Sequence, residues 1–162
     1  MADSLQPSKI LTENFLLLKL KKFLIVFALL STNSSAEPIY SSFDSQFAQG
    51  LDHYKNFQFN KSMAIFNKLF VKYPECYRCV YYKGKSLGHL ASKANWVKAP
   101  KLAVAALDSF KKAYLLNQTD QEVNRDLAKY YMEAPKILGG NIQKAKELKL
   151  KNKELKETVQ GK

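Results

Sequence analysis

Apolar side chains recur at intervals of three and four residues along most of this chain, a spacing typical of amphipathic helices. From residue 43 onward it predicts six helices, whose apolar stripes begin near residues 43, 63, 80, 102, 123 and 142. Ser41 and Thr119 each stand three residues before an acidic side chain and are expected to cap the first and fifth helices. Asn60 is expected to cap the second helix, which ends at Pro74 because proline cannot continue it. The pattern therefore predicts an all-α fold.

Small, aromatic and proline positions recur with a spacing that indicates repeated helix pairs. Gly50, Ser62, Phe66 and Pro74 lie 12, 4 and 8 residues apart. This spacing resembles that of the tetratricopeptide repeat, in which small side chains let two antiparallel helices cross closely. The corresponding positions are filled by Gly84, Ala106 and Phe110 in a second unit, and by Leu127, Ala128, Tyr131 and Ala145 in a third.

The resemblance implies an architecture and a division of the chain. We expect a right-handed stack of about three antiparallel helix pairs, an α-solenoid, at residues 43–158. Its units are expected at about residues 43–76, 77–120 and 121–158. The middle unit is longer than the repeat by about ten residues, which we expect to form a loop near residues 92–101.

The third unit contains a predicted turn. Pro135 is expected to end one helix, Gly139 and Gly140 permit positive backbone φ angles, and Asn141 can cap the next helix. Residues 130–145 are similar to a variant of this repeat found in small exported bacterial proteins. That similarity implies a fold and a compartment rather than a reaction.

The N-terminal region has the three parts of a secretory signal. Lysines at positions 19, 21 and 22 precede an apolar run at residues 23–30, and small residues lead up to Ala36. Because a bilayer span needs roughly 20 apolar residues, we expect cleavage after residue 36 and a periplasmic or secreted bacterial protein. The alternative is an anchor at residues 15–30 that holds the chain at the inner membrane. Residues 37–42 are expected to be an extended segment before the first helix.

The positive charge of the chain limits its partners. The 162 residues include 26 Lys and Arg against 14 Asp and Glu, a formal net charge of +12, and only two of the basic residues are arginine. Export and the scarcity of arginine, which suits bidentate phosphate contacts, argue against nucleic acid. We therefore expect an acidic protein or peptide partner. Peripheral membrane contact, for which the lysine run at residues 144–156 is a candidate, stays open.

Cys76 and Cys79 form a C-x-x-C motif. In an exported protein two cysteines most simply form a disulfide, although free thiols, redox chemistry and zinc binding are alternatives. No predicted strand precedes the motif, and His53 and His89 lie at no zinc-ligand spacing, so neither a metal nor a cofactor is expected. Phosphate-binding loops and hydrolase motifs are also missing from the sequence, and we expect no enzyme activity.

The repeat resemblance also implies a binding surface, because tetratricopeptide stacks bind peptides or helices on a concave face formed by the first helix of each pair. The expected partner-binding residues are Phe47, Leu51, Tyr54, Arg78, Tyr81, Lys85, His89, Arg125 and Lys129. Cationic side chains beside aromatic ones suit an acidic peptide. Alternatively, the first three of these residues pack against residues 39–40.

The expected function is a non-catalytic protein-interaction module in the cell envelope. One alternative is a thiol-disulfide or metal-linked accessory protein that uses Cys76 and Cys79. Another is a basic protein associated with a membrane surface. The oligomeric state stays open, because three units are near the minimum for a stable stack and an exposed end can self-associate.

Overall fold

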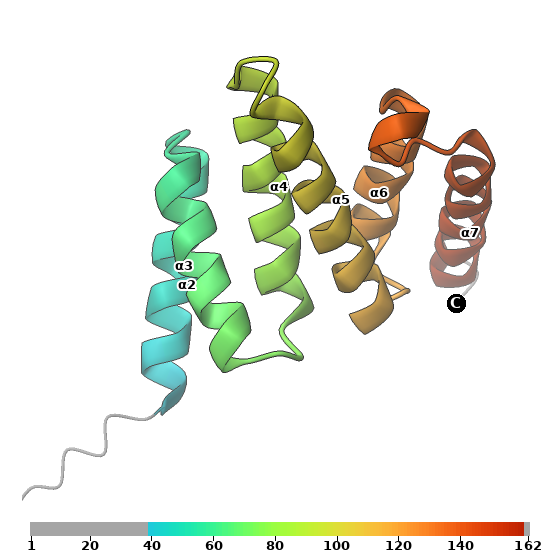
Figure 1. Ribbon diagram of the computed structural model, residues 1–162. Helices are drawn as coiled ribbons and strands as arrows, with labels where there is room; N and C mark the ends of the chain where they lie inside the picture. Colours follow the sequence, from blue (N-terminus) through green and yellow to red (C-terminus); the bar gives the residue numbers. More distant parts are fainter. Residues whose placement is uncertain (1–38, 161–162) are drawn as a thin grey trace, which may run out of the picture. The chain divides into compact units, whose positions relative to one another are not determined.

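The structure is a computed structural model that describes residues 39–160, and the expected signal segment lies outside this range. The described part contains six α-helices and a short 3₁₀-helix (Figure 1). They are α2 (Ile39–Lys55), α3 (Phe59–Lys72), α4 (Tyr77–Lys93), α5 (Ala99–Leu116), α6 (Gln121–Glu133), η1 (Lys136–Leu138) and α7 (Ile142–Gln160). Each helix packs against the next one along the chain, which confirms the predicted all-α fold of antiparallel pairs. None of the helices within residues 39–160 has the length and apolar character needed to cross a bilayer.

The start of α2 corrects one prediction. Residues 39–42 were expected to be extended, but they form the first turn of this helix. The four-residue spacing of Ile39, Phe43 and Phe47 carries the apolar stripe back by one turn, which explains the earlier start. Ser41 therefore lies inside α2 and does not cap it.

Two other helices begin at residues that the capping patterns did not identify. Gln58 precedes α3 without a side-chain capping bond, so Asn60 lies within the first turn. Asp120, not Thr119, caps α6, and its Oδ1 accepts hydrogen bonds of 2.9 and 3.0 Å from two backbone N–H groups of the first turn. A carboxylate is favoured there because it also interacts with the positive end of the helix dipole.

The extra residues of the middle unit lengthen its helices instead of forming the expected ten-residue loop. Helix α4 continues to Lys93 and α5 begins at Ala99, so the connection is only residues 94–98. Pro100 lies in the first turn of α5, where proline is tolerated because its missing N–H would have no helical partner. The predicted loop at residues 92–101 is therefore wrong at both of its ends.

Small residues allow the helices to pack closely. A Cβ atom at Gly50 would lie 2.8 Å from the Phe66 ring, and one at Gly84 would lie 3.0 Å from a side chain of α5. Ser62 and Ser86, both fully buried, join α3 to α4 through a 3.1 Å hydrogen bond between their Oγ atoms. Of the predicted packing residues, Pro74 is exposed, whereas Gly50, Ser62, Phe66, Gly84, Ala106, Phe110, Leu127, Ala128, Tyr131 and Ala145 are buried.

The connection between α6 and α7 has the predicted turn. Helix α6 ends at Glu133, just before Pro135. Gly139 has a φ of +90°, in the left-handed region that favours glycine. Asn141 accepts a 3.0 Å hydrogen bond from the N–H of Lys144 through its side-chain oxygen, which confirms its capping role.

Candidate functional site

Helices α2, α4 and α6 are the first members of the three pairs, and their side chains meet at a groove of about 470 Å³. Tyr54 of α2, Lys85 and His89 of α4, and Asp126 and Lys129 of α6 all line this groove. We call it the α2–α4–α6 groove. Four of these five residues belong to the set that the repeat resemblance implied, so residues from all three units come together at one place.

Lys85 lies at the centre of an aromatic cluster beside the groove. Its Nζ is 5.2, 5.4 and 5.7 Å from the ring centroids of Tyr81, Tyr54 and Tyr82, and 3.7 Å from Oδ2 of Asp126. The negative faces of the rings and the carboxylate both attract the ammonium group. Lys85 is therefore held in place before any ligand arrives.

Tyr81 is a buried residue of α4 that holds a groove residue of α6 in place. It is only 3% exposed, and its hydroxyl donates a 2.7 Å hydrogen bond to Oδ2 of Asp126. Burial, together with this hydrogen bond, raises the pKa of the Tyr81 hydroxyl far above its usual range. Arg125 lies on the other side of the same carboxylate, with its Nε 3.5 Å from Oδ1. Tyr81 thus links α4 to α6, which leaves it no surface for direct contact with a partner.

Tyr54 and His89 join α2 to α4. The Tyr54 hydroxyl oxygen lies 3.0 Å from Nε2 of His89, whose ring stacks on Phe59 with centroids 4.3 Å apart. Burial, followed by the charges of three nearby lysines, lowers the pKa of His89. Burial and then the negative charge of Asp126 raise the pKa of Tyr54 to about 12. Both side chains are therefore neutral at neutral pH and hold the first two units together.

The remaining predicted residues of the first unit lie in its core. Phe47 packs edge-on against Phe66 with centroids 5.3 Å apart, and Leu51 is partly buried in the same cluster. Arg78 extends over the outer face of Phe47, 5.0 Å from its ring centroid. Residues 39–40, which were considered as a covering segment for these side chains, are part of α2 itself.

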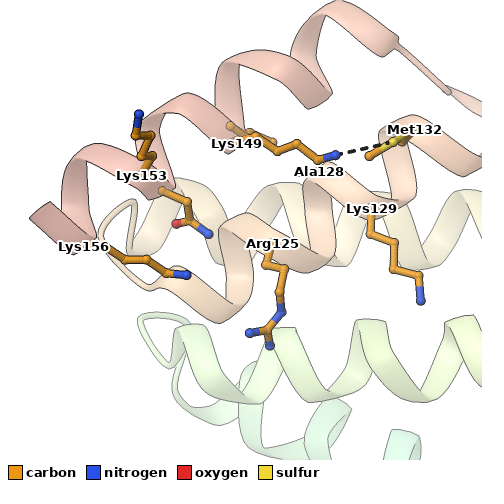
Figure 2. Close-up of a pocket in the computed structure, with 9 residues that line it drawn as sticks. Arg125, Ala128, Lys129, Met132, Lys149, Lys153 and Lys156 are labelled. Carbon is orange, nitrogen blue, oxygen red and sulfur yellow. Dashed lines mark hydrogen bonds between the residues drawn. The ribbon is translucent and has the colours of Figure 1, made fainter.

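A second groove, of about 410 Å³, lies between α6 and α7 (Figure 2). Its lining includes five cationic side chains and no acidic one: Arg125, Lys129, Lys149, Lys153 and Lys156. Lys129 also lines the first groove, so the two are adjacent. The Nζ of Lys149 donates to Sδ of Met132 at 3.6 Å, a weak acceptor for an ammonium group. We call this the α6–α7 groove.

Sequence reasoning missed Asp126 and the three lysines of α7 as site residues. Asp126 stands three residues before Lys129, so the helical spacing that selected Lys129 would also have selected Asp126. The α7 lysines were considered only as one run, a candidate for membrane contact. Only the packing of α7 against α6 shows which three of them face the groove.

Cys76 and Cys79 are joined by a disulfide at the start of α4. Cys79 is fully buried, and the Cys76 sulfur accepts a 3.2 Å hydrogen bond from the N–H of Cys79 at the helix cap. The bridge thus fixes the first turn of α4, with the Cys79 side buried and the Cys76 side partly exposed. Among the described residues, no three His, Cys, Asp or Glu side chains are placed to hold a metal ion.

Comparisons with protein-family models, with curated proteins and with solved structures find no match to this chain. Fold and site together define a class: an all-α protein of three sequential helix pairs, whose first helices form an aromatic groove that continues into a cationic one.

Proposed function

We propose that this protein is a non-catalytic interaction module of the tetratricopeptide-repeat kind, which binds a peptide or partner helix with an acidic segment. The observation that carries the proposal is the meeting of aromatic and cationic side chains from α2, α4 and α6 in one groove that borders a second groove lined by five cationic side chains. Such paired grooves suit an elongated ligand, because a single small molecule would not fill both.

The two grooves differ in charge, so each suits a different part of the partner peptide. In the α2–α4–α6 groove, Lys85 and Lys129 are balanced by Asp126 and Glu133. Aromatic and apolar side chains of the partner therefore fit here, beside Tyr54. No acid lines the α6–α7 groove, although Arg125 and Lys153 pair with acids of their own helices, and the partner's carboxylates fit beside its lysines.

We also propose export to a bacterial periplasm or beyond, with the chain starting after residue 36 in its mature form. Support comes from the signal-like pattern at residues 19–36 and from the Cys76–Cys79 disulfide, a bond that persists in oxidising compartments. The intact mass of the protein isolated from an expressing bacterium tests this. Loss of residues 1–36 is expected, whereas their retention would favour the membrane anchor at residues 15–30.

A fluorescence-polarisation titration tests the binding proposal. The probe is a labelled peptide with a phenylalanine-containing half and a glutamate-rich half, and the same peptide with lysine in place of glutamate is the control. Lys149→Glu with Lys153→Glu is expected to weaken binding by about tenfold or more, equivalent to about 1.4 kcal/mol. Lys61→Glu with Lys68→Glu on α3, a double charge reversal of the same size outside both grooves, is expected to leave binding unchanged. Equal binding by all variants, or equal binding of both peptides, would overturn the proposal.

A further inference from the structure

The turns within the three helix pairs all lie at one end of the stack. Because consecutive helices are antiparallel, the α2–α3, α4–α5 and α6–α7 connections fall at the same end, and Figure 1 shows them along its upper edge. They comprise residues 56–58, 94–98 and 134–141. We call this end the turn edge. The connections between pairs, residues 73–76 and 117–120, lie at the opposite end.

Each turn of this edge exposes a large apolar side chain. Phe57 is 74% exposed in the first turn, Trp96 is 86% exposed in the second, and Ile137 is 90% exposed in the third. A single exposed apolar residue is ordinary, but a group at one edge of a protein indicates a contact surface. The turns at the opposite end include Glu75 and Asp120 and carry no exposed large apolar side chain themselves, although Val71, Leu115 and Leu116 are exposed in the helix ends beside them.

The backbone conformation of Phe57 is unusual for a phenylalanine. Its φ is +58°, in the left-handed region that a bulky residue rarely adopts and that glycine or asparagine occupies more easily. The side chain is mostly solvated, so its packing does little to offset this cost. A phenylalanine here contributes little to the fold, and its apolar ring is free to contact something outside it.

Lysines flank all three exposed apolar residues. The segments 55–61, 93–101 and 133–141 contain six lysines, namely Lys55, Lys61, Lys93, Lys98, Lys101 and Lys136, against the single acid Glu133. Anionic headgroups attract such lysines by about 1 kcal/mol each, and aromatic residues favour the level of the headgroups. Charge and apolar character therefore both match a bilayer that contains anionic lipids.

The three turns form a connected surface. An apolar hollow of about 480 Å³ joins the second and third turns and is lined by Trp96, Pro100, Pro135 and Leu138 among others. At the first turn, the Phe57 ring lies 6.1 Å from that of Phe59, over which the Nζ of Lys93 lies at 5.4 Å from the centroid. The end of α4 therefore lies beside the first turn, through Phe59, and lines the hollow that joins the second and third turns.

We propose that the turn edge docks on the surface of a bilayer containing anionic lipids. Phe57, Trp96 and Ile137 enter the headgroup region, and the flanking lysines pair with lipid phosphates. Protruding apolar side chains on separate turns suit a deformable surface, whereas a protein partner would need a matching pocket for each. None of the three residues lines the α2–α4–α6 or α6–α7 groove, so the proposal does not depend on peptide binding.

Trp96 is the only tryptophan of the chain and reports on this edge directly. The full-length protein is titrated with vesicles of phosphatidylcholine, alone or mixed with phosphatidylglycerol. We expect the Trp96 emission to shift to shorter wavelength with the mixed vesicles, and less at high salt because screening weakens the attraction. Should the N-terminal segment alone hold the chain on vesicles, the protein would sediment with them but the emission would not shift, which would overturn the proposal.

Paired variants locate the contact. Phe57→Ser with Ile137→Ser is expected to weaken vesicle binding, read from Trp96 emission, by about tenfold or more. Val71→Ser with Leu115→Ser replaces two side chains that are 73% and 67% exposed and lie outside the turn edge; this matched control should leave the titration unchanged. Equal loss of vesicle binding in the turn-edge variant and the control variant would overturn the proposal that the turn edge makes the contact. A shift that depends on protein concentration without vesicles would also overturn it, in favour of a second copy of the chain.

Discussion

Helix α4 contains two glycines, Gly84 and Gly88, that test whether close helix crossing stabilises this fold. A Cβ atom at Gly84 would lie 3.0 Å from Cβ of Ser109 and 3.1 Å from Cδ1 of Phe110. At Gly88, one turn further along, nothing lies within 4 Å of the added atom. Two single variants, Gly84→Ala and Gly88→Ala, make the comparison.

The expected magnitudes follow from two opposing effects. Alanine favours the helix over glycine by about 0.5–1 kcal/mol, and this gain is the same in both variants. At Gly84 the new methyl group also forces apart α4 and α5, and overpacking of this kind costs about 1–3 kcal/mol. Gly88→Ala should therefore stabilise the protein, while Gly84→Ala should be less stable than Gly88→Ala by about 1–3 kcal/mol.

Urea denaturation followed by far-ultraviolet circular dichroism measures the free energy of unfolding of both variants. In thermal melts, each 1 kcal/mol corresponds to about 2–4 °C for a protein of this size. Equal stabilisation by the two substitutions would mean that α4 and α5 do not approach as closely as the small residue at position 84 implies.

Three further substitutions test the caps, the bridge and the titration of the site. Asp120→Ala should lower the free energy of unfolding by about 1 kcal/mol, measured by urea denaturation, whereas Asp120→Asn keeps a capping oxygen and should lose less. Replacing Cys76 and Cys79 by serine should lower the same quantity by about 2 kcal/mol in the chain-entropy account, and peptide binding should persist if the bridge is only structural. Because the folded-state pKa of His89 lies below its ordinary value of 6.5, the unfolded chain takes up the proton first, and stability should fall as the pH drops below 6.5. His89→Gln should flatten that part of the stability profile.

The helices were predictable because their apolar stripes are long and regular. Gly50 and Phe66 lie in contact as the repeat spacing implied, since a small residue and a ring are needed where two helices cross. The predicted starts of α2, α3 and α6 were wrong, each for its own local reason. At α6 the carboxylate of Asp120 displaced the hydroxyl of Thr119, a choice that depends on local backbone geometry and not on spacing.

The sequence predicted which residues of the candidate site share a helix face, but it did not predict their contacts. Helical spacing placed Lys85 and Tyr81 on one helix face, but it did not show that Tyr81 is buried and bonded to Asp126. The α6–α7 groove depends on how α7 rotates against α6, because six lysines are spread around that helix. Its apolar stripe is weak, so the sequence alone does not indicate which lysines face the groove.

The two proposed surfaces use the positive charge of the chain in different ways. The α6–α7 groove is lined by five cationic side chains along two neighbouring helices, so a peptide lying along it can bring carboxylates near several of them. On the turn edge the lysines are dispersed around protruding apolar side chains, an arrangement that gains little from one peptide but adds up over a lipid surface. Lys149→Glu with Lys153→Glu should therefore impair peptide binding while vesicle binding persists, and Phe57→Ser with Ile137→Ser should do the reverse. If either pair of substitutions impaired both activities, the protein would have a single basic surface and not a separate groove and edge.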